Sequence, residues 1–259
     1  MRDILAEIVE KKRAIVAEAK KRCPLDDLKT DLPCGTFRMA EHFRWRGWGL
    51  IAECKLQSPA KGRLTTAYSV TELADIYTAA GAAVLSVHTD PHFLGSNEDF
   101  AAVRARVDTP LLRKDFIIDP YQVYEARALG ADAVLLIVRI LTPEELKELL
   151  YLTWSLGMDA LVEVHDRADL EIAHQTSAEF IGINNRNLVT FETSVQTTLD
   201  LLPYADMNRT LISESGIFIR GDAVRVYEAG CKGVLVGEGL VRAEDVDAFA
   251  RELANIKEQ

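Results

Sequence analysis

Short runs of apolar residues recur along most of the chain, and each run ends in polar or glycine residues. The runs are nearly continuous in Val, Ile and Leu, as expected of parallel strands that are buried on both faces. They therefore predict eight strands, over residues 49–55, 83–89, 110–116, 133–139, 160–165, 180–185, 210–216 and 233–237.

Segments with helical periodicity lie between most of these runs and after the last one. They predict helices over residues 70–80, 120–129, 143–156, 167–175, 197–202, 221–229 and 243–256. Thr142 is the expected N-cap of the helix that opens with Pro143. Gly81, Gly130 and Gly230 follow three of the helices, where a left-handed glycine commonly ends the helix.

Alternation of strands and helices with short connections implies parallel strands joined by right-handed crossovers. Eight such units predict an α/β fold, a (β/α)8 TIM barrel. The competing fold, an open doubly wound sheet, usually carries Gly-x-Gly-x-x-Gly after its first strand, and this motif is missing from the sequence.

The first 46 residues follow a different pattern. Residues 3–22 place Ile4, Leu5, Ile8, Ile15 and Val16 among charged residues at helical spacing, and a second short helix is expected over residues 37–43. We therefore expect residues 1–46 to form a helical extension packed on the barrel, and residues 47–259 to form the barrel as one domain. Trp45 and Trp48 are expected to pack the extension onto it.

The composition narrows the class of protein. Of 259 residues, 48% are hydrophobic and 27% charged, and 30 Lys and Arg against 40 Asp and Glu give a net charge of −10. This composition is typical of a globular domain. The acidic balance argues against nucleic-acid or membrane-surface partners, which recruit clustered basic residues. It still allows a small anionic substrate, for which we expect a locally positive pocket.

Cysteine usage and the N-terminal residues bear on the cellular compartment. The four cysteines are scattered without a Cys-x-x-Cys pair, which favours reduced thiols over a zinc site or disulfide framework. Residues 1–12 lack the apolar core of a secretion signal, and no apolar run reaches the length of a membrane span. We expect a cytoplasmic protein.

Ionisable residues close most of the predicted strands. In a TIM barrel the carboxyl ends of the strands build the active site. Because side chains alternate along a strand, Glu53 and Lys55 are expected to share a face at the barrel mouth, and Cys54 to face the helices. Lys114, Glu163 and Glu214 close three further strands. Charges inside a barrel are costly unless paired, so we expect mutual ion pairs and shifted pKa values, which suit acid–base catalysis.

Glycines and histidines also lie at the ends of the predicted strands. Glycines at 216, 237 and 239 end the last two strands, where backbone N–H groups of TIM barrels commonly hold a phosphate. His88, Asp90 and His92 are too weak a pattern for a metal site, because Pro91 intervenes and a clear further ligand is missing. We interpret the histidines as loop residues without a ligand role.

Seven segments resemble the motifs of indole-3-glycerol-phosphate synthases, in the order in which that family carries them. They are residues 53–62 (ECKLQSPAKG), 85–90 (LSVHTD), 110–124 (PLLRKDFIIDPYQVY), 161–166 (LVEVHD), 181–188 (IGINNRNL), 211–217 (LISESGI) and 234–242 (VLVGEGLVR). The resemblance covers nearly the whole chain. It implies a carboxy-lyase of tryptophan biosynthesis that converts 1-(2-carboxyphenylamino)-1-deoxyribulose 5-phosphate to indole-3-glycerol phosphate.

The resemblance also assigns roles to individual residues. It implies Lys114 as the general acid, and Glu163 with Lys55 in the later proton transfers and the dehydration. The remaining active-site positions are Glu53, Asn184, Glu214 and Ser215, the phosphate contacts are Ser58, Gly216 and Gly237, the carboxylate contact is Arg186, and the lining of the aromatic pocket is Phe116 and Leu135. The reaction has no redox step, and the sequence has no cofactor motif, so neither a cofactor nor a metal is expected. A monomer or weak homo-oligomer is expected.

The sequence departs from the family pattern at Leu56-Gln57, where the family often has a basic residue, and at His88, where it usually has an apolar one. The first departure points to Lys61 and Arg63 as alternative phosphate contacts. Two other functions stay open at this point. A phosphoribosylanthranilate isomerase-like enzyme would need a cysteine base, for which Cys54 is the candidate, and a catalytically impaired phosphate-binding barrel would keep the site without turnover.

Overall fold

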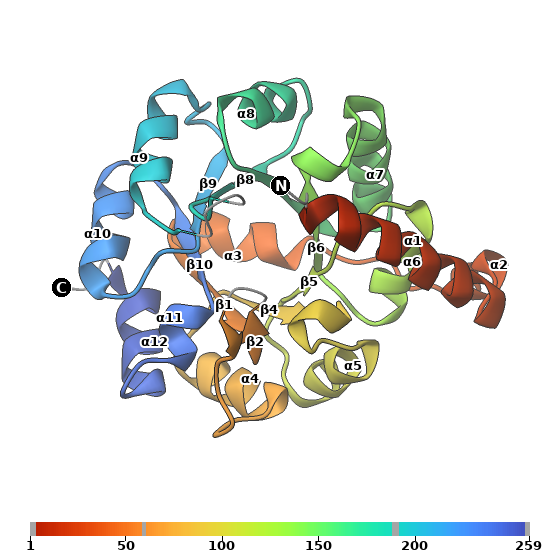
Figure 1. Cartoon of the computed structure of the whole chain (residues 1–259), viewed down its shortest axis with the longest axis horizontal. Coiled ribbons are helices and arrows are strands. Elements are labelled where there is room, and N and C mark those ends of the chain that lie inside the picture. The colour runs from red at the N-terminus through yellow and green to blue at the C-terminus, as the bar shows by residue number, and fades with distance from the viewer. Residues whose placement is uncertain (1–3, 59–60, 188–191, 257–259) are drawn as a thin grey trace.

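A computed structural model describes residues 4–58, 61–187 and 192–256 of the chain. Asp3, Pro59, Ala60 and Leu188, which belong to predicted segments, lie outside the described residues. Eight parallel strands close into a barrel in which each strand pairs with the next along the chain and the last pairs with the first (Figure 1). The barrel strands are β1 Gly49–Cys54, β4 Val84–His88, β5 Leu111–Lys114, β6 Ala133–Ile137, β7 Asp159–Val164, β8 Phe180–Asn184, β9 Thr210–Glu214 and β10 Gly233–Val236.

Helices surround this barrel, so the (β/α)8 fold predicted from the sequence is confirmed (Figure 1). The outer helices are α4 Val70–Ala79, α5 Asn97–Arg106, α6 Pro120–Ala128, α7 Pro143–Ser155, α8 Arg167–His174, α9 Gln196–Leu201, α10 Arg220–Glu228 and α12 Val246–Ala254. Thr142 caps α7 as predicted, and Gly81, Gly130 and Gly230 have φ of 90°, 86° and 114°. These left-handed glycines end α4, α6 and α10.

Several elements were not predicted. They are α5, the short helices α2 Leu25–Lys29 and α11 Glu238–Val241, the 3-10 turns η1 Pro91–Phe93, η2 Val138–Ile140 and η3 Leu202–Tyr204, and the small hairpin of β2 Gln57–Ser58 with β3 Gly62–Arg63. Helix α5 buries only Phe100 and Val103, which leaves almost no apolar periodicity in its sequence. None of the helices that the structure describes is long and apolar enough to cross a bilayer.

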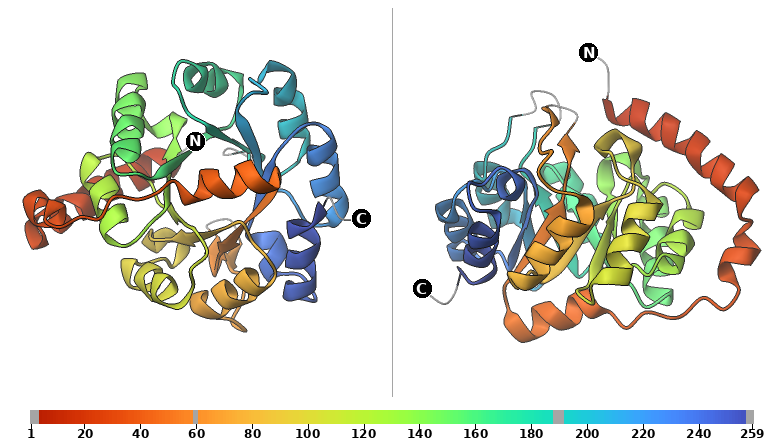
Figure 2. Two further views of the ribbon diagram at one scale, coloured as in Figure 1. Left: turned by 180° about the vertical axis from the view of Figure 1, so that it is seen from behind. Right: turned by 90° about the horizontal axis from the view of Figure 1, so that it is seen from below.

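Helix α3 (Arg38–Arg46) lies across the end of the barrel where the strands begin (Figure 2). Phe43 packs edge-on against Phe180 inside the barrel, with 5.5 Å between ring centroids. Trp48 is buried against the outer helices of the barrel: its indole N–H donates to the carbonyl of Leu253 at 2.8 Å, and its ring packs edge-on against Tyr227. The prediction for Trp45 is wrong, because this side chain is 83% exposed.

Helix α1 (Ile4–Arg22) lies at the opposite end of the barrel from α3, beside the carboxyl ends of the strands, and descends along its outer side (Figure 2, right). Its buried residues Ile8, Lys12 and Val16 are four residues apart and form one stripe. The prediction for this stripe was wrong at two positions. Ile15 is 38% exposed, and Lys12 is only 2% exposed.

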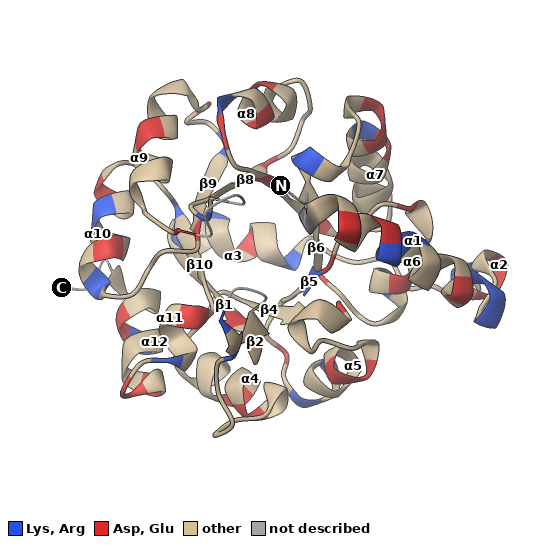
Figure 3. Cartoon of the chain, in the orientation of Figure 1, with Lys and Arg blue, Asp and Glu red and all other residues tan. Residues whose placement is uncertain are grey.

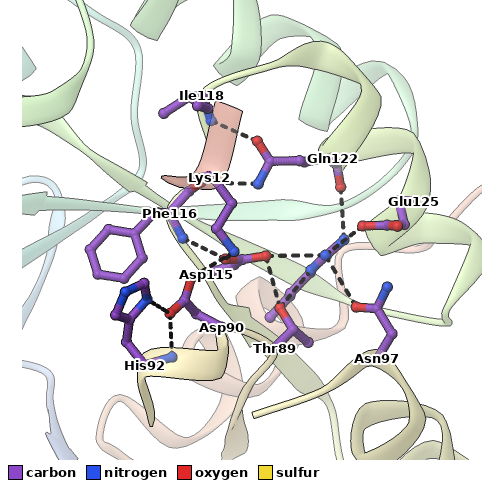
Figure 4. A network of polar contacts seen from close by, with 11 residues as sticks. Lys12, Thr89, Asp90, His92, Asn97, Asp115, Phe116, Ile118, Gln122 and Glu125 are labelled. Carbon is purple, nitrogen blue, oxygen red and sulfur yellow. Dashed lines mark hydrogen bonds and ion pairs between the residues drawn. The ribbon is translucent and has the colours of Figure 1, made fainter. Parts of the chain in front are cut away.

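Lys12 is buried because two aspartates from the barrel receive its ammonium group (Figure 4). Its Nζ lies 2.7 Å from Asp90 Oδ2 and 2.5 Å from Asp115 Oδ1. The Arg113 guanidinium binds the other oxygen of Asp115 at 3.1 Å. Burial alone would raise the pKa of Asp115, but Arg113 and Lys12 lower it. The network fixes α1 to β5 next to Lys114.

Candidate active site

All thirteen predicted site residues line one pocket at the carboxyl ends of the barrel strands. The strands place them there because inward-facing positions alternate along each strand and the strand ends meet in one ring. The pocket also contains Gly239, one of the glycines expected to hold a phosphate. The other residues that line the pocket were given no role in the site from the sequence, and they are Leu5, Ile8, His88, Phe93, Asp115, Ile137, His165, Ile217, Phe218, Leu235, Val236 and Glu238.

Lys114, at the end of β5, lies at the centre of the charged groups. Its Nζ is 3.0 Å from Glu163 Oε2 on β7 and 3.0 Å from Glu214 Oε2 on β9. All three side chains are largely buried, with 13%, 5% and 1% of their surface exposed. Two carboxyl groups that share one ammonium in a buried pocket form a single coupled acid–base unit.

The pKa values of this unit are shifted in opposite directions. Burial alone would lower the pKa of Lys114, but Glu163, Glu214 and Glu53 raise it, so Lys114 is charged at neutral pH. Burial and the neighbouring Glu163 raise the pKa of Glu214 to about 8. Lys114 and His165 outweigh burial at Glu163 and lower its pKa to about 2, helped by a hydrogen bond from Asn184. At neutral pH the unit therefore holds an ammonium, a carboxylate and a protonated carboxyl group.

A second ion pair lies at the carboxyl end of β1. Lys55 Nζ is 3.2 Å from Glu53 Oε2, and both side chains are largely buried. Cys54 points away from the pocket into the core between strands and helices, as predicted. Burial raises the pKa of its thiol far above the usual value. Cys54 is therefore unable to supply the base that the isomerase-like alternative needs.

One half of the pocket is apolar. Phe93 and Phe116 stack with 6.1 Å between centroids, and Leu135 and Ile137 of β6 extend the apolar surface. Leu5 of α1 lines the same pocket, so the N-terminal helix contributes to its wall. An aromatic ring of a substrate fits the chemistry of this half.

The other half is rich in glycine. Ser215 and Gly216 follow β9 with φ of 66° and 75°, two successive left-handed residues that turn the backbone at the pocket. Gly237 follows β10, and Ser58, only 2% exposed, joins them from the hairpin after β1. Backbone N–H groups at such turns can hold an anion, which agrees with the predicted phosphate contacts.

The expectation of a locally positive pocket is wrong. Lys55, Lys114 and Arg186 line it together with five carboxyl-bearing residues, which are Glu53, Asp115, Glu163, Glu214 and Glu238. Arg186 Nη2 lies 3.7 Å from Glu238 Oε2, and Lys61 Nζ lies 2.6 Å from Glu238 Oε1. The cations are thus balanced by carboxylates, and the outer surface also mixes both signs (Figure 3). This balance favours backbone N–H groups over lysine as the main phosphate contacts.

The prediction for the histidines is partly wrong. His88 is the last residue of β4 and faces the pocket, where Nε2 lies 2.8 Å from Glu53 Oε1. Asp90 and His92 contact each other instead, through a 2.7 Å hydrogen bond (Figure 4). His165 is also buried in the pocket, with Nε2 3.3 Å from Glu163 Oε1. Within the described residues, no group of three His, Cys, Asp or Glu side chains is placed to hold a metal ion.

Gly182 on β8 supplies the space that Glu214 occupies. A Cβ atom at this position would lie 1.9 Å from Glu214 Oε1, so Gly182→Ala should displace the carboxyl group from Lys114. Because a displacement of about 1 Å in an active site can cost roughly 10²-fold, we expect kcat to fall by about that factor. Steady-state kinetics of the purified variant would measure the loss.

Gly221→Ala on α10 is the matched control. A Cβ atom there meets only Ile219, at an ordinary contact distance of 3.6 Å. We expect this variant to retain wild-type kcat and thermal stability. A Gly182→Ala enzyme with the same kcat as Gly221→Ala would show that the position of Glu214 does not matter for turnover.

The fold and the pocket together define a (β/α)8-barrel enzyme with an acid–base site at the carboxyl ends of its strands. A sequence profile described as "Indole-3-glycerol phosphate synthase" matches residues 5–253. The chain is 44% identical over 257 residues to the indole-3-glycerol phosphate synthase of Dehalococcoides mccartyi, covering 96% of this chain and 99% of that protein. It is 41% identical over 260 residues to that of Azospirillum brasilense, with 98% and 99% covered. The chain belongs to the indole-3-glycerol phosphate synthase family.

Among solved structures, the 3-hexulose-6-phosphate synthase of Salmonella typhimurium matches with a TM-score of 0.64 at 14% sequence identity. The match covers 80% of this chain and 97% of that chain. At this level of identity the similarity concerns the fold alone.

Proposed function

We propose that the protein converts 1-(2-carboxyphenylamino)-1-deoxyribulose 5-phosphate to indole-3-glycerol phosphate, carbon dioxide and water. The observation that carries this proposal is the Lys114 ammonium held by Glu163 and Glu214, at 3.0 Å from each, in the same pocket as an apolar and a glycine-rich wall. A substrate with an aromatic carboxylate at one end and a phosphate at the other suits these two walls. Membership of the family supports the same activity.

Ring closure is the first step. The aromatic carbon that bears the carboxylate attacks the C2′ carbonyl carbon, and the carbonyl oxygen needs a proton as the new bond forms. Lys114 supplies it, because its carboxylate neighbours keep the ammonium charged and in place. Phe116 and Leu135 would hold the ring, and Arg186 the carboxylate.

Decarboxylation follows at the carbon that was attacked. The carboxylate leaves as carbon dioxide, and its bonding electron pair restores the aromatic ring. Lys114 is now a neutral amine, so the positive charge that lowers the pKa of Glu163 is gone while burial still raises it. The first step thereby makes Glu163 a stronger base for the last one.

Dehydration completes the indole. Glu163 removes a proton from C1′, and Lys55 protonates the C2′ hydroxyl group, which leaves as water. Glu163 can return its proton to Lys114 across their 3.0 Å hydrogen bond, and Lys55 recovers its proton from solvent. One solvent proton is consumed per turnover, which balances the loss of the carboxylate charge. Ser58, Gly216 and Gly237 would hold the phosphate throughout, while Glu53, Asn184 and Ser215 position the reacting groups.

The test is an assay of the purified chain with the synthetic substrate. We expect continuous formation of indole-3-glycerol phosphate, read by its fluorescence, with one carbon dioxide released per product. Binding of the substrate without product would instead favour the catalytically impaired phosphate-binding barrel.

The same proposal includes the organisation of the chain. We assign residues 1–46 to an N-terminal extension and residues 47–259 to the barrel, which the contacts of Lys12 with Asp90 and Asp115 support. A monomer or weak homo-oligomer working in the cytoplasm suits the acidic chain. Size-exclusion chromatography with light scattering would measure the oligomeric state.

A further inference from the structure

His88 occupies a position inside the barrel mouth that the reaction described above does not use. It is the last residue of β4, is 6% exposed, and lies opposite Lys114 in the register of β4 with β5. Its neighbour on the other side is β1, which carries Glu53 and is followed directly by Lys55. An imidazole group is therefore placed between the two ion pairs of the site.

The contacts of His88 give each oxygen of Glu53 its own partner. Nε2 of His88 lies 2.8 Å from Oε1, while Nζ of Lys55 lies 3.2 Å from Oε2. Gly237 leaves the space for this arrangement, because a Cβ atom there would lie 1.9 Å from Oε2. Glu53 is thus held in one orientation from two sides.

The ring of His88 is itself fixed. It stacks on Phe93 with 4.5 Å between centroids and an interplanar angle of 8°. Phe93 in turn receives Lys55 Nζ at 5.2 Å over its ring and stacks on Phe116. The imidazole plane therefore cannot rotate away from Glu53 without breaking this stack.

The charges around His88 determine which nitrogen carries the proton. Burial lowers the pKa of His88, as do Lys55, which follows β1, and Lys114 on β5, while Glu53 acts in the opposite direction. The imidazole is therefore neutral at neutral pH. A carboxylate only accepts hydrogen bonds, so in the neutral ring Nε2 must bear the hydrogen that bonds to Glu53.

We propose that His88 is a positioning residue for the reaction, which donates from Nε2 to Glu53 and holds that carboxylate ionised and oriented against Lys55. Lys55 then keeps the position from which it protonates the leaving hydroxyl group. This inference rests on the proposed function, because Lys55 and Glu53 act in that reaction. It adds a residue that neither the motif pattern nor the mechanism above assigns.

Two substitutions separate the hydrogen bond from the ring stack. His88→Gln keeps an N–H donor near the position of Nε2 but removes the ring, and His88→Phe keeps the ring on Phe93 but removes the donor. A hydrogen bond to a charged group contributes enough that its loss should lower kcat by about tenfold or more, with KM nearly unchanged. We expect this loss in His88→Phe and near wild-type kcat in His88→Gln.

The pH profile gives a second readout. Burial alone would raise the pKa of Glu53, but Lys55, His88 and Lys114 bring it well below the usual value. His88→Phe removes one of the three groups that lower the pKa of Glu53, so this pKa rises. Lys55 and Lys114 still limit the rise. If activity requires the ionised carboxylate, the acid limb of kcat/KM moves to higher pH in His88→Phe and stays in place in His88→Gln.

His42→Gln is the control, because His42 lies on α3 at the other end of the barrel and burial also lowers its pKa. It should leave kcat and the acid limb unchanged. The inference is overturned if His88→Phe keeps wild-type kcat and pH profile. It is also overturned if His88→Gln loses as much activity as His88→Phe, since the ring stack would then carry the effect.

Nuclear magnetic resonance provides a readout that needs no turnover. In protein labelled with ¹⁵N-histidine, long-range proton–nitrogen correlations distinguish the two neutral tautomers, and the signal missing from His88→Gln identifies His88 among the 5 histidines. We expect the Nε2–H tautomer. The Nδ1–H tautomer would overturn the inference. Failure of the wild-type chain to form indole would overturn the proposed function, and the tautomer seen in the spectrum would still show whether His88 donates to Glu53.

Discussion

Replacing Lys114 by alanine should reduce indole formation by about 10³-fold or more, because it removes the only ammonium placed between Glu163 and Glu214 in the described structure and general acids contribute 10²- to 10⁴-fold. The loss should appear in kcat, since the proton is needed only as the ring closes. Without the ammonium, burial favours protonation of both carboxyl groups, so the barrel should still fold. Single-turnover experiments should detect neither carbon dioxide nor indole on the wild-type time scale.

Two further variants test whether the loss of activity is due to the ammonium group of Lys114. Lys114→Met keeps most of the side-chain volume, so an equal loss in both variants would assign the effect to the ammonium group and not to packing. Lys147→Ala on the exposed face of α7 is the control for loss of a lysine and should be fully active. Circular dichroism melting curves would verify the fold of each. Wild-type turnover in Lys114→Ala would remove Lys114 from the role of general acid.

The barrel could be predicted from the sequence because strands that are buried on both faces appear as short, nearly continuous runs of apolar residues. Strands such as β1 and β6 are packed on both faces, so nearly all of their residues are apolar. Helix α5 lacks such a pattern, since Phe100 and Val103 are its only buried residues. Its start is still encoded, because the Ser96 side chain accepts a hydrogen bond from the Asp99 backbone.

The site residues could be predicted where the barrel fold alone determines their positions. Lys114 is the last residue of β5 and Glu163 the last but one of β7, and the carboxyl ends of parallel strands must meet. Contributions from distant segments could not be predicted in this way. Lys12 is charged, and only the two aspartates that meet it in the folded chain make its burial acceptable. His88 lies inside a predicted strand, but its hydrogen bond to Glu53 becomes apparent only once β4 is seen to pair with β1.

The balance of charge in the pocket changes how substrate binding should be understood. The cations at positions 55, 114 and 186 already have carboxylate neighbours, so an arriving phosphate gains little from them. The glycine-rich turns after β9 and β10 offer uncharged backbone donors instead. In the proposed reaction the lysines would thereby be available for proton transfer and would not have to neutralise a permanent charge.

Replacing Glu163 by glutamine should separate the two halves of the reaction. Glutamine can still accept a hydrogen bond from Lys114 but cannot remove the C1′ proton, so ring closure and decarboxylation should continue while dehydration slows. Because acid–base groups contribute 10²- to 10⁴-fold, we expect kcat to fall by about 10²-fold. Rapid-quench measurement of carbon dioxide alongside stopped-flow indole fluorescence should reveal one equivalent of carbon dioxide per site before any indole.

This early release of carbon dioxide distinguishes the role of Glu163 from that of Lys114, because removal of Lys114 should block the formation of carbon dioxide and of indole together. Glu148→Gln, on the exposed face of α7, is the control for loss of a carboxylate and should release both products at the same rate as the wild type. If carbon dioxide and indole instead appear together in Glu163→Gln, the slow step precedes decarboxylation. Glu163 would then act through its ion pair with Lys114 during ring closure, and the base for the C1′ proton would have to be sought elsewhere in the pocket, first at Lys114 itself.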